Sequence, residues 1–264
     1  MTAPGEFFDT GAGLRCQWMT FEDAPEWYTA HFQTGIPKQR LSLGGAIVFE
    51  RSGPEDNRSV SITAAYRIPL KRDAFLSVGL LGGIYRTELN PTNFRANQIN
   101  DPLFSATSTA ATAPNLGAGF YFVSNTDFLD QRNKGFFVGL GIQQSFPNHR
   151  DLYLTNEPHF NASIGGGIEL GPIFGECSIW MDYTPTNLFY GTLATRFYLG
   201  RVWWIGGTIG QDYTFGLSLG CLLINKLGDG DIRLTGRAYS PGRGKRWSTF
   251  GPTGEVAVAY QFAY

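Results

Sequence analysis

The chain has 264 residues, of which 34 are glycine, 15% are aromatic and only 16% are charged. Glycine is present at nearly twice its usual share, and charge falls well below the roughly 25% of an average globular chain. A formal net charge of −1 and a sequence pI of about 6.3 provide no broad basic field, which argues against a nucleic-acid partner. Disorder is excluded, because a chain that is 42% hydrophobic can bury a large apolar surface. No run of 18 apolar residues occurs, so no helix is expected to cross a bilayer.

Alternation of apolar and small polar residues predicts β-strands along the whole chain. Between residues 58 and 70, Val, Ile, Tyr and Leu alternate with Ser, Thr, Ala and Arg, which is the two-residue period of a strand with one apolar face. Residues 159–170, 231–239 and 255–264 repeat the pattern. From one turn signal to the next we predict about fourteen strands, near 12–20, 26–36, 40–51, 58–70, 73–88, 114–123, 134–146, 158–170, 172–184, 187–199, 200–211, 213–224, 230–240 and 253–264.

The predicted connections differ in length. Most are tight, such as the turn at 228–230, whereas three are long, near 89–113, 147–157 and 241–252. If the strands run up and down, all three long loops follow odd-numbered strands and therefore share one rim. Short turns at one rim and long loops at the other are typical of outer-membrane barrels.

The second face of the strands separates a membrane barrel from soluble β folds. A β-sandwich or a lipocalin-like barrel carries Lys and Glu freely on its outer face, whereas here the second face is mostly Gly, Ala, Ser, Thr and Asn. We therefore predict an all-β, antiparallel, up-and-down transmembrane barrel of about 14 strands, a single domain over 1–264, with a soluble β fold as the alternative. The aromatic residues near strand ends are expected at the interfacial girdles, namely Trp18, Trp27, Tyr28, Trp180, Tyr183, Tyr198, Trp203, Tyr239 and Tyr264. The three cysteines are expected on the apolar face, namely Cys16, Cys177 and Cys221.

Charges of both signs are expected on the inner face. Turning Arg196, Arg233 and Arg237 toward lipid would cost roughly 2 to 4 kcal/mol each near the bilayer midplane. A sum of about 6 to 12 kcal/mol would remove a typical protein's net stability, so the facing of the strands is strongly determined. We expect these charges to line the lumen, as a salt-bridged filling or as a lining that selects what enters: Arg67, Glu169, Glu176, Asp182, Arg196, Arg233 and Arg237.

No motif predicts catalysis, a cofactor or a metal. Residues 216–220 match GxSxG, but a nucleophile elbow needs a strand-to-helix turn and these residues lie in mid-strand. The glycines at 165–167 lack the Lys-Ser/Thr of a phosphate loop, and no histidines have metal-binding spacing. His31 is expected to be a hydrogen-bonding group of the lumen. A solvated loop, or one near lipopolysaccharide or a partner, explains the basic cluster Arg243, Lys245 and Arg246 better than nucleic acid does.

Ten short stretches, spread nearly from end to end, carry a family resemblance. They are Gly11–Arg15, Leu43–Ala46, Arg51–Pro54, Ala65–Leu70, Leu76–Leu80, Asn100–Pro102, Pro114–Tyr121, Phe137–Leu140, Gly207–Asp212 and Tyr260–Phe262. In their order and spacing the chain resembles the PorP/SprF family, outer-membrane β-barrel proteins associated with type IX secretion and gliding motility in Bacteroidota.

The resemblance implies a location and a role. It implies the bacterial outer membrane, no enzymatic activity, and help in delivering or anchoring surface adhesins through their C-terminal domains. The implied partners are a secreted adhesin or its C-terminal domain, other type IX secretion components and outer-membrane lipid. Members usually begin with a signal peptide and a polar-aromatic segment ending in an Asn-Pro-Ala-Tyr-like stretch, so a part upstream of Thr2 is expected. Two alternatives stay open: a channel for small or hydrophobic solutes, and a lipid hydrolase using Ser218 or a histidine.

Overall fold

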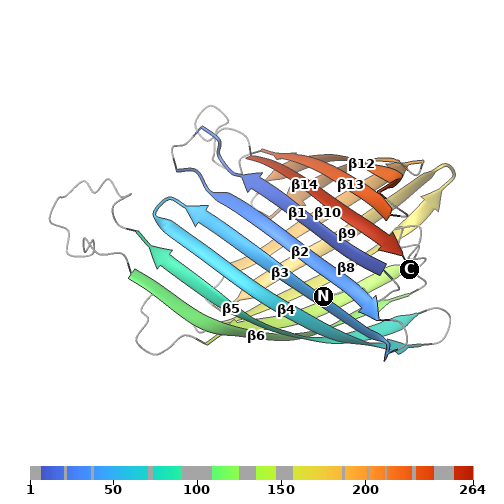
Figure 1. The fold of residues 1–264 in the computed structure, drawn as a ribbon. Coiled ribbons are helices and arrows are strands. Elements are labelled where there is room, and N and C mark those ends of the chain that lie inside the picture. Colours follow the sequence, from blue (N-terminus) through green and yellow to red (C-terminus); the bar gives the residue numbers. More distant parts are fainter. Residues whose placement is uncertain are drawn as a thin grey trace.

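The computed structural model is a closed barrel of fourteen antiparallel strands (Figure 1). Each strand pairs with its neighbours in the sequence and β1 pairs with β14, so the sheet has no free edge. The strands are β1 (Phe7–Cys16), β2 (Glu26–Ile36), β3 (Leu41–Ser52), β4 (Glu55–Pro69), β5 (Phe75–Leu89), β6 (Thr109–Val123), β7 (Phe136–Ser145), β8 (Pro158–Leu170), β9 (Ile173–Thr184), β10 (Leu188–Leu199), β11 (Trp203–Gly210), β12 (Phe215–Leu227), β13 (Gly230–Tyr239) and β14 (Thr253–Ala263). The predicted fold class and number of strands are confirmed.

The structure describes most of the chain. The described residues are 7–20, 23–36, 39–70, 74–90, 109–124, 135–146, 157–185, 188–200, 202–211, 213–227, 230–240 and 253–263. The basic cluster at 243–246 and Tyr264 lie outside them. Among the described residues, none forms a helix long and apolar enough to cross a membrane.

The first strand lies five residues upstream of its predicted position. We expected it at 12–20, whereas β1 begins at Phe7 and ends at Cys16. The chain turns directly after this strand, where Trp18 has a φ of 53°, although the sequence alternation continues past that point. The true start is set by barrel closure, because Phe7–Cys16 pairs residue by residue with Gly254–Ala263. Local periodicity holds no information on that long-range register.

The two rims of the barrel differ, as predicted, with one exception. We call the rim where odd-numbered strands end the loop rim, and the opposite one the turn rim. The long connections after β5, β7 and β13 all lie at the loop rim. The connection between Val123 and Phe136 is also long, yet it joins β6 to β7 at the turn rim. The expected asymmetry is therefore incomplete.

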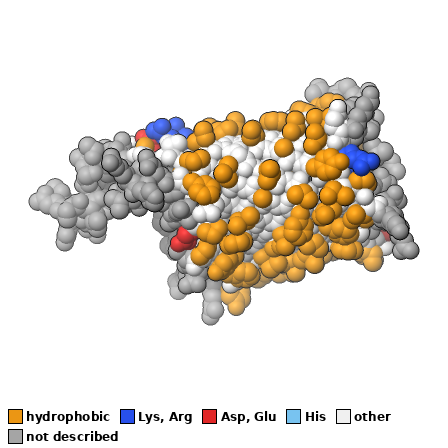
Figure 2. All heavy atoms as spheres, turned by 90° about the horizontal axis from the view of Figure 1, so that it is seen from below, with side chains coloured by type: hydrophobic (Ala, Val, Ile, Leu, Met, Phe, Trp, Pro, Cys, Tyr) orange, Lys and Arg blue, Asp and Glu red, His pale blue; other side chains and the backbone are white. Residues whose placement is uncertain are grey.

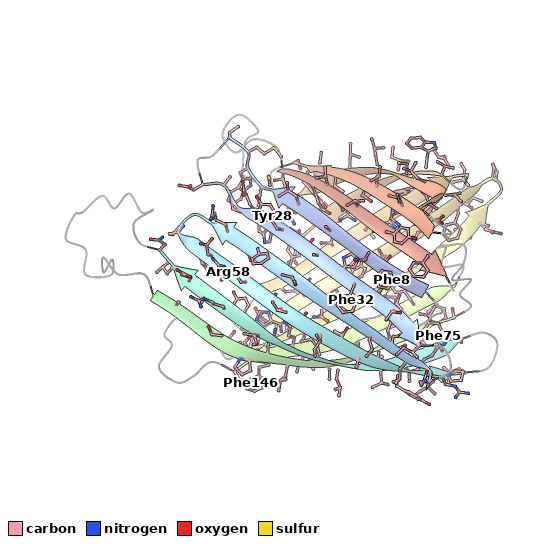
Figure 3. The ribbon with its side chains drawn as sticks, viewed as in Figure 1. Phe8, Tyr28, Phe32, Arg58, Phe75 and Phe146 are labelled. Carbon is pink, nitrogen blue, oxygen red and sulfur yellow. The ribbon has the colours of Figure 1, made fainter. Side chains whose placement is uncertain are left out.

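The outer wall is apolar and exposed. Ile62 and Leu80 are each 68% exposed and Leu217 is 70% exposed, values that would place these side chains in water if the protein were soluble. Figure 2 shows hydrophobic side chains spread over the visible wall from one end to the other, with charged ones only toward its two ends. Tyr28 and Phe32 lie on this wall along β2 (Figure 3). Such a surface is stable in hydrocarbon, where a closed sheet also pairs every backbone group in its ladder.

The inner face is built from small and polar side chains. The buried side chains of the described residues include as many polar as hydrophobic ones, with Ser42 and Ser77 among the most buried. Cys16, Cys177 and Cys221 lie on the outward face, as expected, because Cys16 alternates with inward Arg15 and Cys221 pairs with outward Trp203. This inside-out distribution fits a barrel whose outside meets lipid.

Candidate functional site

A cavity of about 450 Å³ lies in the lumen, against the arc of wall from β9 through β14 to β1. Gln17, Trp18, Thr214 and Ser240 place its mouth at the loop rim, since all four follow or join odd-numbered strands there. The rest of its lining combines hydroxyl groups, aromatic rings and ionic side chains, namely Arg15, Glu176, Ser178, Trp180, Tyr190, Thr192, Thr195, Arg196, Thr208, Ser218, Arg237, Tyr239 and Thr253.

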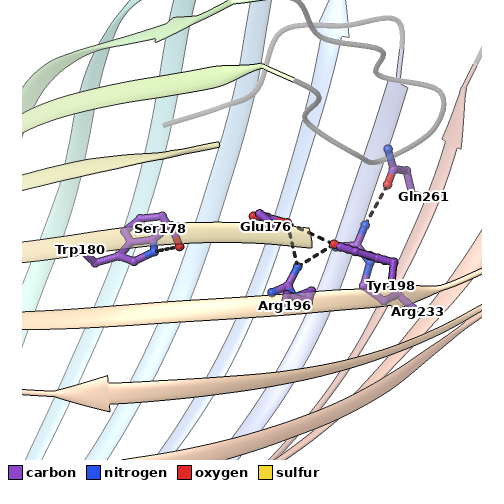
Figure 4. A network of polar contacts seen from close by, with 7 residues as sticks. All are labelled: Glu176, Ser178, Trp180, Arg196, Tyr198, Arg233 and Gln261. Atoms are coloured by element: carbon purple, nitrogen blue, oxygen red, sulfur yellow. Dashed lines mark hydrogen bonds and ion pairs between the residues drawn. The ribbon is translucent and has the colours of Figure 1, made fainter. Parts of the chain in front are cut away.

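A polar network on β9 and β10 forms the first part of this wall (Figure 4). The Arg196 Nη1 donates to the Tyr198 hydroxyl at 3.0 Å, and that hydroxyl donates to the Glu176 carboxylate at 3.3 Å. Arg196 and Glu176 are directly opposite in the register, with 3.9 Å between their closest charged atoms. Nearby, Arg233 donates to the Gln261 side-chain oxygen at 3.3 Å and joins β13 to β14. These contacts hold the two arginine side chains against the wall.

A second cluster lies on β13, β14 and β1. The Arg237 Nη1 donates to a Glu255 carboxylate oxygen at 2.7 Å, and the Tyr239 hydroxyl donates to the other oxygen at 3.3 Å. The Arg15 guanidinium lies 5.0 Å from the Trp27 ring centre and 5.2 Å from that of Tyr239, within the range of cation–π attraction. The cluster closes the seam between the last strands and the first with charge on the inner side.

The other predicted inner charges lie apart from these clusters. Arg67 is near the turn rim, with its guanidinium 4.6 Å from the Phe75 ring centre. Glu169 is opposite Phe174 next to the β8–β9 turn, and Asp182 is opposite Asn161 and Tyr190. All seven predicted residues are on the strand face opposite the exposed apolar row. The structure brings Glu176 together with Arg196, with Arg233 nearby, and pairs Arg237 with Glu255. Arg67, Glu169 and Asp182 lie elsewhere on the wall.

Several of the aromatic residues expected at the interfacial girdle face the lumen instead. Trp27 and Tyr239 stack on inward Arg15, Trp180 donates to the hydroxyl of inward Ser178 at 3.1 Å, and Tyr198 bonds Glu176. Tyr28, Tyr183 and Trp203 do face outward. Nearness to a strand end was the wrong criterion, because only the parity of a residue in its strand decides the face.

A ring of inward aromatic side chains at the turn rim was not anticipated from the sequence. Its members are Phe75, Tyr121, Phe137, Phe174, Tyr198 and Trp204, and Val123 completes a buried cluster with Phe75 and Phe137. The Tyr121 and Phe137 ring centres are 5.7 Å apart, as are those of Phe174 and Tyr198. The side chains form two groups, one on β5 to β7 and one on β9 to β11, and we call the whole set the turn-rim aromatic ring.

Glycines on the neighbouring strands leave space for two of these rings. A Cβ at Gly165 would lie 2.6 Å from the Phe137 ring, and one at Gly220 would overlap the Trp204 ring. Each glycine is directly opposite its aromatic partner in the register. An aromatic residue facing an inward glycine across a hairpin was therefore the signal in the sequence that would have revealed the ring.

The remaining sequence motifs that could indicate catalysis or metal binding lie in ordinary strand positions. Gly216–Gly220 lies within β12 with no helix following, and Ser218 sits opposite Arg237 on the inner face. The His31 Nε2 is 3.0 Å from a carboxylate oxygen of the buried Asp9, which fits the expected hydrogen-bonding role in the lumen. In the part of the chain that the structure describes, no group of three metal-ligating side chains gathers. Within the described strands, the cavity wall thus presents hydrogen-bonding and ionic groups of the kind that bind a ligand.

Known structures with a similar architecture are bacterial outer-membrane proteins. CdiB from Acinetobacter baumannii aligns with a TM-score of 0.51 and 8% identity over 97% of this chain, which spans 60% of that protein. A FadL homologue from Pseudomonas aeruginosa gives 0.49 and 10% identity, covering 97% of this chain and 89% of that one. The outer membrane protein Omp33 of Acinetobacter baumannii gives 0.48 and 7%, covering 98% and 100%. At such identities the likeness shows the fold alone, and no curated protein matches the sequence.

A family model identifies the protein family, which the fold alone does not. The model for the type IX secretion system membrane protein PorP/SprF matches residues 3–229, which is most of the chain. This agrees with the resemblance seen in the ten ordered stretches and with an apolar-walled barrel of fourteen strands. The chain therefore belongs to the PorP/SprF family of type IX secretion system membrane proteins, and its closed β-barrel has the fold of a bacterial outer-membrane protein.

Proposed function

We propose that this barrel is an accessory of type IX secretion and gliding motility that helps deliver or anchor surface adhesins by contacting their C-terminal domains at the loop rim and in the lumen cavity. The observation that carries the proposal is the family match over residues 3–229. Its partners in the outer membrane are then the secreted adhesin and other components of the secretion system.

The lumen cavity supports a binding role. Trp180 is 52% exposed and Tyr190 42% exposed although both belong to the cavity wall, so their faces are accessible from inside the barrel. Arginine forks that reach into a polar space bind carboxylate and backbone carbonyl groups, and aromatic faces pack against side chains. An extended polypeptide segment presents both kinds of group, which makes it a fitting occupant for this wall.

The turn-rim aromatic ring supports an accessory rather than an open solute channel. Phe75, Phe137 and Phe174 are at most 5% exposed, so these rings are packed against their neighbours instead of lining an aqueous path. Close-packed aromatic side chains at one rim reduce the bore there. A polar cavity at the loop rim with a packed opposite rim suits holding a segment more than passing a solute.

The test is display of an adhesin by a strain that lacks the gene. We expect deletion to lower surface adhesin, measured by antibody labelling of intact cells, and the wild-type gene to restore it. Trp180→Ala should restore display poorly, because it removes the exposed aromatic face of the cavity. The matched control Trp203→Ala removes a tryptophan from the outer wall and should restore display fully. Normal display and motility in the deletion strain would contradict the proposed role.

A further inference from the structure

Charged side chains interrupt the apolar outer wall on one side of the barrel. Within the strand residues whose side chains the structure describes, the outward charges all lie on β2 to β5, next to the loop rim. On three adjacent strands the first outward residue beyond the apolar run is an arginine. We call the outward charges the outer belt: Glu26, Arg51, Asp56, Arg58, Arg86 and Glu88.

The outer belt stands at the height of lipid headgroups. On β4 the outward residues from Val60 to Leu70 are apolar, and a rise of about 3.3 Å per residue at a tilt near 40° makes this run roughly 25 Å tall. That equals the apolar band of an outer-membrane barrel. Arg58 is the next outward residue, about 5 Å higher by the same estimate. Figure 3 shows it near the loop rim, at the opposite end of the barrel from Phe75.

The carboxylates of the belt already have partners. The Arg51 Nε donates to Asp56 at 3.1 Å, and the Arg86 Nη2 is 3.3 Å from Glu88. Glu26 accepts a hydrogen bond from the Tyr28 hydroxyl at 2.9 Å. Each negative charge on this part of the wall is thus engaged with a neighbour.

Arg58 is left over. It is exposed, and across the described residues it forms neither an ion pair nor a hydrogen bond. The register places it directly opposite Arg86, so two arginines occupy neighbouring outward positions on adjacent strands. Like charges in direct opposition destabilise a sheet, and an anion bound between them would offset the repulsion. The Arg86 side chain is 48% exposed and retains donors that Glu88 does not use.

We propose that Arg58 and Arg86 bind the phosphate of a phosphorylated lipid in the outer leaflet, with its acyl chains against the apolar wall below. Two guanidinium forks suit phosphate oxygens, and the pair offsets the repulsion that the register imposes. Val60 and Ile84, the next outward residues on the same strands, are 53% and 58% exposed and meet the upper part of the chains. A phosphate directly above an exposed apolar row is the chemistry of a lipid rather than of a soluble anion.

The experiment compares lipid retention by the purified full chain in nanodiscs. The probes are phosphorylated lipid A and the same lipid without its phosphates, counted on the barrel by native mass spectrometry. We expect wild-type protein to retain the phosphorylated form, and Arg58→Gln to bind it about tenfold more weakly, the loss expected from one set of charge-assisted hydrogen bonds. Arg58→Lys keeps the charge without the fork and should bind with intermediate strength.

The matched control is Arg51→Gln with Asp56→Asn, which removes the neighbouring ion pair as a unit and should leave retention unchanged. Mobility of unheated protein on a denaturing gel confirms that each variant is a folded barrel. Equal retention by wild type and Arg58→Gln would overturn the proposal, as would equal retention of the two forms of the lipid. Binding of inorganic phosphate with the same affinity as the lipid would also overturn it, because the site would then take the anion alone.

Discussion

At the scale of single residues, adjacent positions of one strand meet opposite media. Ile62 on β4 is outward and 68% exposed, whereas Thr63 is half-buried on the opposite face of the strand, which faces the lumen. The two Cα atoms are about 3.8 Å apart along the chain. A charge placed at one or the other therefore tests the face assignment directly.

We expect Ile62→Arg to lower the free energy of unfolding by roughly 2 to 4 kcal/mol, because the charge would enter the apolar band. Thr63→Arg adds the same group on the inner side and should cost distinctly less. Urea unfolding in lipid vesicles, followed by tryptophan fluorescence, measures both. A cost for Thr63→Arg as large as that for Ile62→Arg would show that the two faces have been interchanged.

The ion pair between Arg237 and Glu255 is a second residue-scale test. Its 2.7 Å hydrogen bond is partly screened from solvent, with side-chain exposures of 35% and 19%. Removing one charge leaves the other without its ionic partner, so Glu255→Gln should lower the free energy of unfolding by about 1 to 2 kcal/mol. The more exposed pair Arg51–Asp56 is the control, and breaking it with Asp56→Asn should cost roughly 0 to 1 kcal/mol.

A double-mutant cycle assigns this cost to the pair. In Arg237→Gln with Glu255→Gln, both charges are gone, so the combined cost should be smaller than the sum of the single costs. Strictly additive costs would mean that the two side chains stabilise the barrel independently, in conflict with the observed geometry.

At the scale of elements, periodicity predicted the strands well wherever hairpin neighbours determine them. β2 begins and ends where expected, and most other strands differ by one to three residues. β1 was misplaced because its position depends on pairing with β14, which is distant in sequence. β6 begins at Thr109 instead of 114, since the Ala-Thr run before Pro114 has little hydrophobic contrast to reveal the inward Ala111 and Ala113.

The candidate site was only partly predictable, for a related reason. Parity identifies an inward charge such as Arg196, but its partners lie on other strands and depend on register. Arg15 and Glu255 alternate with apolar residues and were recognisable as inward by the same rule. Their contacts with Tyr239 require closure of the barrel, which no local pattern contains.

Packing between elements gives a prediction for glycine. A Cβ at Gly165 on β8 would lie 2.6 Å from the Phe137 ring and 2.7 Å from the Cys177 backbone oxygen, and that oxygen cannot move away easily. Gly165→Ala should therefore lower the free energy of unfolding by about 1 to 3 kcal/mol.

Gly82→Ala is the matched control, because no atom lies within 4 Å of the added methyl group. It should be neutral or slightly stabilising in the same urea unfolding experiment, since alanine has less conformational freedom in the unfolded chain. Equal destabilisation by both substitutions would indicate a general need for glycine in strands, and not a specific need for space beside the Phe137 ring.

At the scale of the whole molecule, the lumen is unequal along its axis. The cavity of about 450 Å³, with its arginines and hydroxyl groups, opens at the loop rim and extends as far as Glu176 and Arg196. The turn rim holds the aromatic ring, with Phe75 fully buried and Arg67 stacked over it. Hydrophobic packing at one end and polar space at the other are the basis on which we propose that the barrel holds a segment and does not pass a solute.

Conductance in planar bilayers tests this description of the lumen. Wild-type barrel should conduct little, and Phe75→Ala with Phe137→Ala should raise conductance several-fold, because two packed rings leave the turn rim and the cavity is already polar. The control Phe120→Ala with Phe136→Ala removes two outward rings from the neighbouring strands and should leave conductance low. High conductance in the wild type would mean that the ring does not obstruct the bore, and the channel alternative would then explain the lumen better than the binding role does.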